Sequence, residues 1–182
     1  GEVEEVRAQL EALPVHPALL SIPQIIFFGA TLNAVFAFGE ELGWRGLMYR
    51  ELRPLGFWSS SFLIGVLWGL WHAPLILLGH NYPDHPLLGI GLFTVQCAAM
   101  SPLYTLVRER SGSVWAAAVL HGTFNAAAGI PLLITQGGSP MMTGVTGVAG
   151  LIGLVMLNVL LWLATRSGTL TPPPVHASSG AA

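Results

Sequence analysis

The chain has 182 residues, of which 53% are hydrophobic and only 9% are charged, and its formal net charge is −2 at pH 7. An ordinary soluble domain carries about 25% charged residues, so this composition predicts a protein embedded in a membrane. The 7 Lys and Arg residues are spread between apolar segments, which excludes a nucleic-acid-binding face. The single cysteine, Cys97, lies in an apolar segment without a partner and is interpreted as a packed core residue.

Five apolar runs, each near the roughly 20 residues that cross a bilayer core, predict five transmembrane helices. They cover residues 19–38, 59–79, 87–107, 113–135 and 141–163. Residues 1–18 are polar and acidic and predict a short surface segment, whereas residues 165–182 are rich in Pro, Ser and Gly and predict a disordered tail. The expected fold is therefore an all-α integral membrane protein, with a membrane-embedded bundle of about five helices over residues 19–164.

The arginines predict how the bundle is oriented in the membrane. They follow the first, third and fifth runs, at Arg50, Arg53, Arg108, Arg110 and Arg166. Residues 80–86 and 136–140, which connect the other runs, contain no Lys or Arg. Because basic loops stay in the cytoplasm, we expect the C-terminus to be cytoplasmic and the acidic N-terminal segment to lie on the opposite side.

Three charges interrupt the first apolar region, at Glu40, Glu41 and Arg45. Glu41 and Arg45 are four residues apart, so on a helix they share a face and can pair, which reduces the cost of burying both. Glu40 points roughly 100° away and has no cation one helical turn before or after it. A buried carboxylate without a counter-charge is a candidate general base.

His72, His121 and Asn125 are polar residues within other predicted spans. Each taken alone is explained by a hydrogen bond between helices. At 1.5 Å per residue from the basic side, however, Glu40 and His72 lie about 20 Å deep, and His121 and Asn125 about 12–18 Å deep. Four polar side chains on three helices therefore share a level, which favours a single buried polar site.

Three short motifs occur in order along these helices: Glu40-Glu41-x-x-x-Arg45, Trp68-x-x-x-His72 and His121-x-x-x-Asn125. Together they resemble the CAAX protease and bacteriocin-processing (CPBP) family of intramembrane endopeptidases, which includes the type 2 CAAX prenyl proteases. The resemblance covers residues 38–128. Two departures are visible, because Trp68 stands where the family usually has phenylalanine and fewer spans precede the first motif than is common.

The resemblance implies an all-helical intramembrane fold and a role for each motif residue. Glu40 and His72 match the pair that activates water, and His121 and Asn125 match the residues assigned to stabilising the oxyanion. Glu41 and Arg45 match positions that hold the site in shape. It also implies a peptide or prenylated protein as substrate and the lipid bilayer as surroundings.

The same residues admit other chemistries. Peptide hydrolysis needs an activated water and donors to the oxyanion, which the four catalytic candidates supply without a metal, and we favour this interpretation. Glu40, His72 and His121 could instead bind zinc as three ligands with an open position for water. Beyond enzymes, a proton-coupled transporter uses buried Glu and His residues, although the five runs show no internal repeat. A non-catalytic membrane scaffold or immunity protein is the remaining alternative.

Overall fold

The computed structural model describes residue 15 and residues 17–130 and 138–168. The described residues form helices and turns, without any β-strand among them. The fold is therefore all-α, as predicted. The predictions for the polar N-terminal segment and for the C-terminal tail fall almost wholly on residues outside the described part of the chain.

A long helical segment comes first. Its parts are α2 (Pro17–Phe28), η1 (Gly29–Asn33), α3 (Ala34–Glu41), η2 (Leu42–Met48), α4 (Tyr49–Leu52) and η3 (Arg53–Leu55). Two parts, η1 and η2, are π-helical turns, which are wider than α-helical turns and occur often at functional sites. Because η2 begins directly after Glu41, the Glu40/Glu41 motif lies where the helical pitch changes. Gly56 ends the segment with φ of 86°, a left-handed value that glycine adopts without strain.

The remaining described helices are α5 (Phe57–Trp71), α6 (Ala73–Leu77), α7 (Pro86–Ser111), α8 (Val114–Ala127) and α10 (Val148–Arg166). His72 lies between α5 and α6, where Pro74 has no N–H to continue the α5 hydrogen-bond ladder. Ser113 caps α8 by accepting a hydrogen bond from the Trp115 backbone N–H. The polar residues of the motifs thus lie near a helix end (His72) and within helices (His121 and Asn125).

Within the described residues, four helical stretches are long and apolar enough to cross a membrane: Leu19–Leu55, Phe57–Leu77, Pro86–Ser111 and Val148–Arg166. The protein is therefore a multi-pass integral membrane protein. The predicted fourth span is not among the four, because α8 has 14 residues and reaches roughly 21 Å, less than the hydrocarbon thickness of about 30 Å. Residues 131–135 of that span lie outside the described part. The fifth span begins later than predicted, since residues 140–146 form turns and bends.

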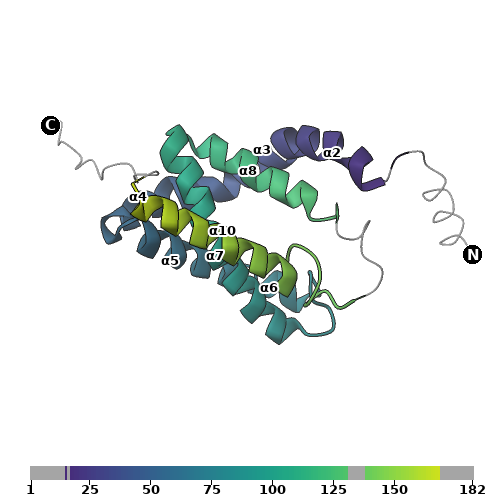
Figure 1. Cartoon of the computed structure of the whole chain (residues 1–182). Helices are drawn as coiled ribbons and strands as arrows, with labels where there is room; N and C mark the ends of the chain where they lie inside the picture. The colour runs from purple at the N-terminus through teal and green to yellow at the C-terminus, as the bar shows by residue number, and fades with distance from the viewer. Residues whose placement is uncertain (1–14, 16, 131–137, 169–182) are drawn as a thin grey trace, which may run out of the picture.

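The helices pack closely through small residues. Helix α5 lies along α7, α8 lies against α3 and η1, and α10 covers α7 (Figure 1). A Cβ atom added at Gly69 of α5 would lie 2.4 Å from the Thr94 Cα of α7, and one at Gly122 of α8 would lie 2.5 Å from the Ala34 nitrogen. Helix backbones approach this closely only where side chains are absent. The packing brings α3, α5, α7 and α8 together around one interior.

That interior combines apolar and polar side chains. A buried cluster of Trp68, Cys97, Ala99, Met100, Tyr104 and Leu154 forms its apolar part. Cys97 is fully buried, as predicted for a packed residue. At the end of the bundle where the first segment stops, Arg53 Nε lies 3.4 Å from Glu109 Oε1 near the end of α7. The arginine-bearing ends of the first segment and of α7 are therefore on the same side of the bundle.

Candidate active site

Glu41 and Arg45 form the ion pair that their spacing predicts, and both side chains are fully buried. Arg45 Nη1 lies 3.2 Å from Glu41 Oε1, and Arg45 Nη2 donates to Ser101 Oγ at 3.0 Å. The guanidinium lies between two aromatic rings, 5.0 Å from the Trp68 centroid and 4.9 Å from that of Tyr104. Pairing, hydrogen bonding and cation–π contacts reduce the cost of removing two charges from water, whereas Glu41 Oε2 and Arg45 Nε are buried without a hydrogen-bond partner among the described residues.

His121 joins this pair from α8. Its Nδ1 lies 2.9 Å from Glu41 Oε1, and its ring stacks on Tyr104 with centroids 5.7 Å apart. An ionised carboxylate only accepts hydrogen bonds, so His121 Nδ1 carries the hydrogen and Nε2 is the nitrogen left for other partners. The sequence does not predict this contact, because Glu41 and His121 are 80 positions apart and no local spacing relates them.

Glu40 has different surroundings from Glu41. It is half-buried, and its Oε2 accepts a hydrogen bond of 3.0 Å from the indole Nε1–H of Trp68. His72 contacts the same tryptophan, since its Nδ1 lies 2.9 Å from the Trp68 carbonyl oxygen. A carbonyl oxygen is an acceptor, so His72 Nδ1 donates and the Nε2 of the neutral ring keeps its lone pair.

One cavity of about 270 Å³ brings the four predicted catalytic residues together. Glu40 reaches it from α3, His72 from the end of α5, and His121 and Asn125 from α8. The four side chains that the sequence places at one depth thus line one space, and Trp68, Phe93 and Met100 form apolar parts of its wall.

The cavity also has polar lining residues that sequence reasoning missed. Gln96, Asn81 and Thr146 belong to its wall. The fully buried Gln96 donates from Nε2 to the Val145 carbonyl, and the Tyr82 hydroxyl donates to the Thr146 carbonyl. Gln96 could have been found from the sequence, because it is an amide side chain within an apolar run. No sequence feature marks Thr146, which lies in a turn.

His80 lies in the loop between α6 and α7. It is exposed, but it lines the same cavity as His72. Partial burial and, to a smaller extent, the charge of His72 lower the pKa of His80 from its ordinary value. The loop after α6 therefore belongs to the surroundings of the site.

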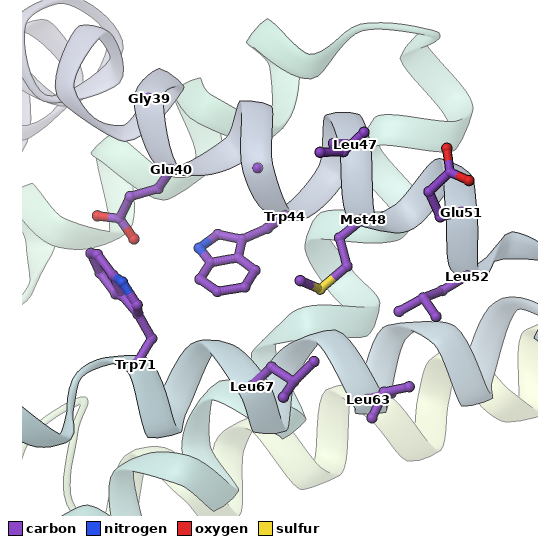
Figure 2. Close-up of a pocket in the computed structure, with 11 residues that line it drawn as sticks. Gly39, Glu40, Trp44, Leu47, Met48, Glu51, Leu52, Leu63, Leu67 and Trp71 are labelled. Carbon is purple, nitrogen blue, oxygen red and sulfur yellow. The ribbon is translucent and has the colours of Figure 1, made fainter.

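A second, apolar cavity of about 690 Å³ lies between the first helical segment and α5 (Figure 2). Its wall includes Trp44, Leu47, Met48, Leu63, Leu67 and Trp71. Figure 2 shows Glu40 and Trp71 at one end and Glu51 at the other. Glu40 belongs to the lining of both cavities, so the apolar space leads to the candidate base.

The zinc alternative requires three ligands close together. Within the described part of the chain, no three His, Cys, Asp or Glu side chains lie close enough to one another to hold a metal ion. His72 and His121 each use Nδ1 for a protein partner, which leaves one nitrogen apiece.

The fold and the cavity define the class of protein. It is a multi-pass helical membrane protein in which a carboxylate, two imidazoles and an amide line one cavity inside the helical bundle. The family described as "Type II CAAX prenyl endopeptidase Rce1-like" matches residues 22–127, more than half of the chain, and the chain belongs to this family. This confirms the resemblance carried by the three motifs and places the chain in a family of proteases.

A curated relative, CAAX prenyl protease 2 of Methanococcus maripaludis, is 40% identical over 58 residues. The matched stretch covers 31% of this chain and 20% of the relative. No solved structure matches the chain significantly.

Proposed function

We propose that this chain carries the catalytic site of an intramembrane endopeptidase that hydrolyses a peptide bond with a water activated by Glu40 and His72. The observation that carries the proposal is the single cavity lined by Glu40, His72, His121 and Asn125. Membership of the type II CAAX prenyl endopeptidase family supports the reaction class, and the relative's name supports a CAAX protein that bears a prenyl group as substrate.

In this proposal two acceptors hold the water. Trp68 occupies Oε2 of Glu40, so Oε1 accepts one hydrogen of the water, and His72 Nε2 accepts the other. The water oxygen attacks the carbonyl carbon of the scissile bond as its proton passes to Glu40. When the C–N bond of the tetrahedral intermediate breaks, Glu40 returns that proton to the leaving nitrogen. The products are an amine and a carboxylic acid, and the enzyme regains its starting state.

The developing oxyanion needs hydrogen-bond donors on the other side of the carbonyl. Asn125 provides amide N–H groups. His121 provides an N–H from Nε2 only when its ring is doubly protonated, because Nδ1 already donates to Glu41. In this proposal Glu41 accepts from Nδ1, so Nε2 is the nitrogen of His121 that serves the oxyanion.

The apolar cavity suits the hydrocarbon part of such a substrate. It lies between two helices, its lining is almost wholly hydrophobic, and it shares Glu40 with the catalytic cavity. An apolar chain that leaves water for this space gains about 0.8 kcal/mol for each buried CH₂. A prenyl group in the apolar cavity would hold the attached peptide beside Glu40.

For the orientation, we propose a cytoplasmic C-terminus. The ion pair of Arg53 with Glu109 supports it, because it joins the basic ends of the first segment and α7 on one side. If the chain crosses the membrane five times, α10 is the fifth crossing and runs in the same direction as the first segment and α7. Arg166, at the end of α10, then lies on the same side as Arg53. This arrangement treats α8 as a short fourth crossing.

The proposed reaction is tested with the full chain purified in detergent or reconstituted in lipid and given a fluorescent prenylated CAAX peptide. We expect cleavage at one bond, retained after exhaustive chelation and in samples that hold no metal by elemental analysis. Activity restored only by added zinc would establish the metal alternative. A wild-type protein that cleaves no peptide, but whose cellular function survives Glu40→Gln, would indicate a scaffold or transporter.

A further inference from the structure

Trp68 contacts more parts of the polar site than any other motif residue does. Its side chain is 2% exposed, and its indole N–H donates to Glu40 Oε2 while its carbonyl oxygen accepts from His72 Nδ1. Its ring meets the His121 ring edge-on at 5.2 Å and lies 5.0 Å from the Arg45 guanidinium. One residue of α5 therefore joins α3, η2 and α8 at the level of the cavity.

The two hydrogen bonds of Trp68 act on the two groups proposed to hold the water. An indole is a donor only, so its N–H selects one carboxylate oxygen of Glu40 and leaves the other for a different partner. The backbone carbonyl of Trp68 selects Nδ1 as the protonated nitrogen of His72, which leaves Nε2 as an acceptor. The orientation of Glu40 and the tautomer of His72 are thus set from a single position.

The backbone of α5 is held firmly at this position. The next residue, Gly69, packs so closely on α7 that an added Cβ would lie 2.4 Å from the Thr94 Cα. The Trp68 ring also contacts Tyr104 of α7 at 5.7 Å. A donor on a closely packed helix, with a large ring enclosed on several sides, has little freedom to move away from Glu40.

We propose that Trp68 is the positioning residue of this site: its indole N–H and its carbonyl oxygen direct Glu40 and His72 toward the same water. The effect on catalysis rests on the proposed function. The hydrogen bond between Trp68 and Glu40 does not, and it can be tested without any substrate. Trp68 touches no reacting atom and acts through its two partners.

A packing role and a positioning role predict different outcomes for Trp68→Phe. Phenylalanine keeps an aromatic ring in the core but lacks the N–H. If Trp68 only fills space, the variant loses stability and keeps its kinetics. If Trp68 positions Glu40, kcat falls roughly 10–100-fold with little change in KM, since misplacement of a catalytic group costs about that much. The pH profile of kcat also changes, because the carboxylate of Glu40 loses the hydrogen bond from the indole N–H.

Other ionisable groups surround Glu40 and enter the same pH profile. They are His72 and His80 beside the α6 end of the cavity, Cys97 and Tyr104 on α7, His121 on α8, and Glu41 and Arg45 on its own segment. The comparison is therefore made between matched variants. Trp58→Phe is the control, because Trp58 lies on the same helix and stacks on Phe62 with centroids 5.8 Å apart, away from the cavity.

The experiment has two readouts on the full chain. In the first, Trp68→Phe lowers kcat and changes its pH profile, whereas Trp58→Phe changes neither. In the second, the protein is labelled with ¹⁵N-tryptophan, and the Trp68 indole signal is identified by single Trp→Phe changes at the other five tryptophans. That signal moves upfield in Glu40→Ala, and the Trp58 signal does not.

The two readouts separate failure of this inference from failure of the proposed function. A wild-type protein without peptidase activity defeats the proposed function, and the indole signal still decides whether Trp68 holds Glu40. An indole signal of Trp68 that is unchanged in Glu40→Ala overturns the inference, even in an active enzyme. Unchanged kcat and an unchanged pH profile in a folded Trp68→Phe overturn it as well.

Discussion

Glu40 and Glu41 are neighbours in the chain, but their carboxylates have different partners. Glu41 is fully buried and bonded to Arg45 and His121, whereas Glu40 is half-buried, accepts from Trp68 and lines two cavities. Both contacts of Glu41 use Oε1, and its Oε2 is buried without a hydrogen-bond partner among the described residues. Glu40 is the carboxylate of the two that borders open space. This division suits a structural role for Glu41 and a chemical role for Glu40.

The first prediction concerns the stability that depends on Glu41. Glu41→Gln leaves the Arg45 guanidinium buried without a counter-charge, so we expect the free energy of unfolding to fall by about 3–5 kcal/mol. Thermal unfolding in detergent measures the effect. The matched control is Glu51→Gln, whose carboxylate is 65% exposed and pairs with an exposed arginine, so it should change stability by less than about 1 kcal/mol. Equal losses in the two variants would contradict the account of the buried pair.

The second prediction is a pH dependence of stability through His80. Because the pKa of His80 is lowered in the folded protein, the unfolded chain binds a proton more readily below its ordinary pKa of about 6.5. Stability therefore falls as the pH drops through that value toward the lowered pKa. His80→Gln should reduce this loss in melting curves recorded from pH 7.5 to 5. His85→Gln, in the same loop but outside the cavity lining, is the control and should melt like the wild type at every pH.

The third prediction concerns the apolar cavity as a site for the hydrocarbon part of the substrate. Leu67→Trp places a larger side chain in that cavity and should raise KM for a prenylated peptide by roughly tenfold, which corresponds to about 1.4 kcal/mol of lost binding. Leu70→Trp on the same helix lines neither cavity and should leave KM unchanged. A KM that is insensitive to Leu67→Trp would exclude this cavity as the binding site.

The fourth prediction is the direction of insertion. Green fluorescent protein fused to the C-terminus should fluoresce in a bacterial host, and alkaline phosphatase fused at the same point should be inactive, because the C-terminus is proposed to be cytoplasmic. Active phosphatase at this position would reverse the orientation of all the helices.

The sequence predicted those parts of the site that depend on helical geometry. The pairing of Glu41 with Arg45 follows from i,i+4 spacing, and the common depth of Glu40, His72 and His121 follows from the rise per residue. The contacts of Glu41 with His121 and of Glu40 with Trp68 bridge 80 and 28 positions. They depend on how helices rotate against each other, which hydrophobic runs do not encode.

The bounds of the predicted fourth and fifth spans differ from the bounds of α8 and α10 for a similar reason. An apolar run of about 20 residues marks a candidate span, but helix bounds are set by capping and turns. Ser113 caps α8, which begins at Val114 and ends at Ala127 after 14 residues. Gly144 has a left-handed φ of 79° in the turns before α10, so that helix begins at Val148, seven positions after the predicted start of its span. The turns also supply Thr146 to the cavity wall.

The most direct test of the account is mass spectrometry of a prenylated CAAX peptide incubated with the wild-type protein and with Glu40→Gln. Glutamine has nearly the same shape and still accepts from Trp68, so Glu40→Gln removes the base while keeping the fold. We predict one cleavage by the wild type, a rate lower by about 10²–10⁴-fold in Glu40→Gln, and full activity in Asp84→Asn, which alters an exposed carboxylate outside the cavity. Cleavage by Glu40→Gln at the wild-type rate would contradict the central claim.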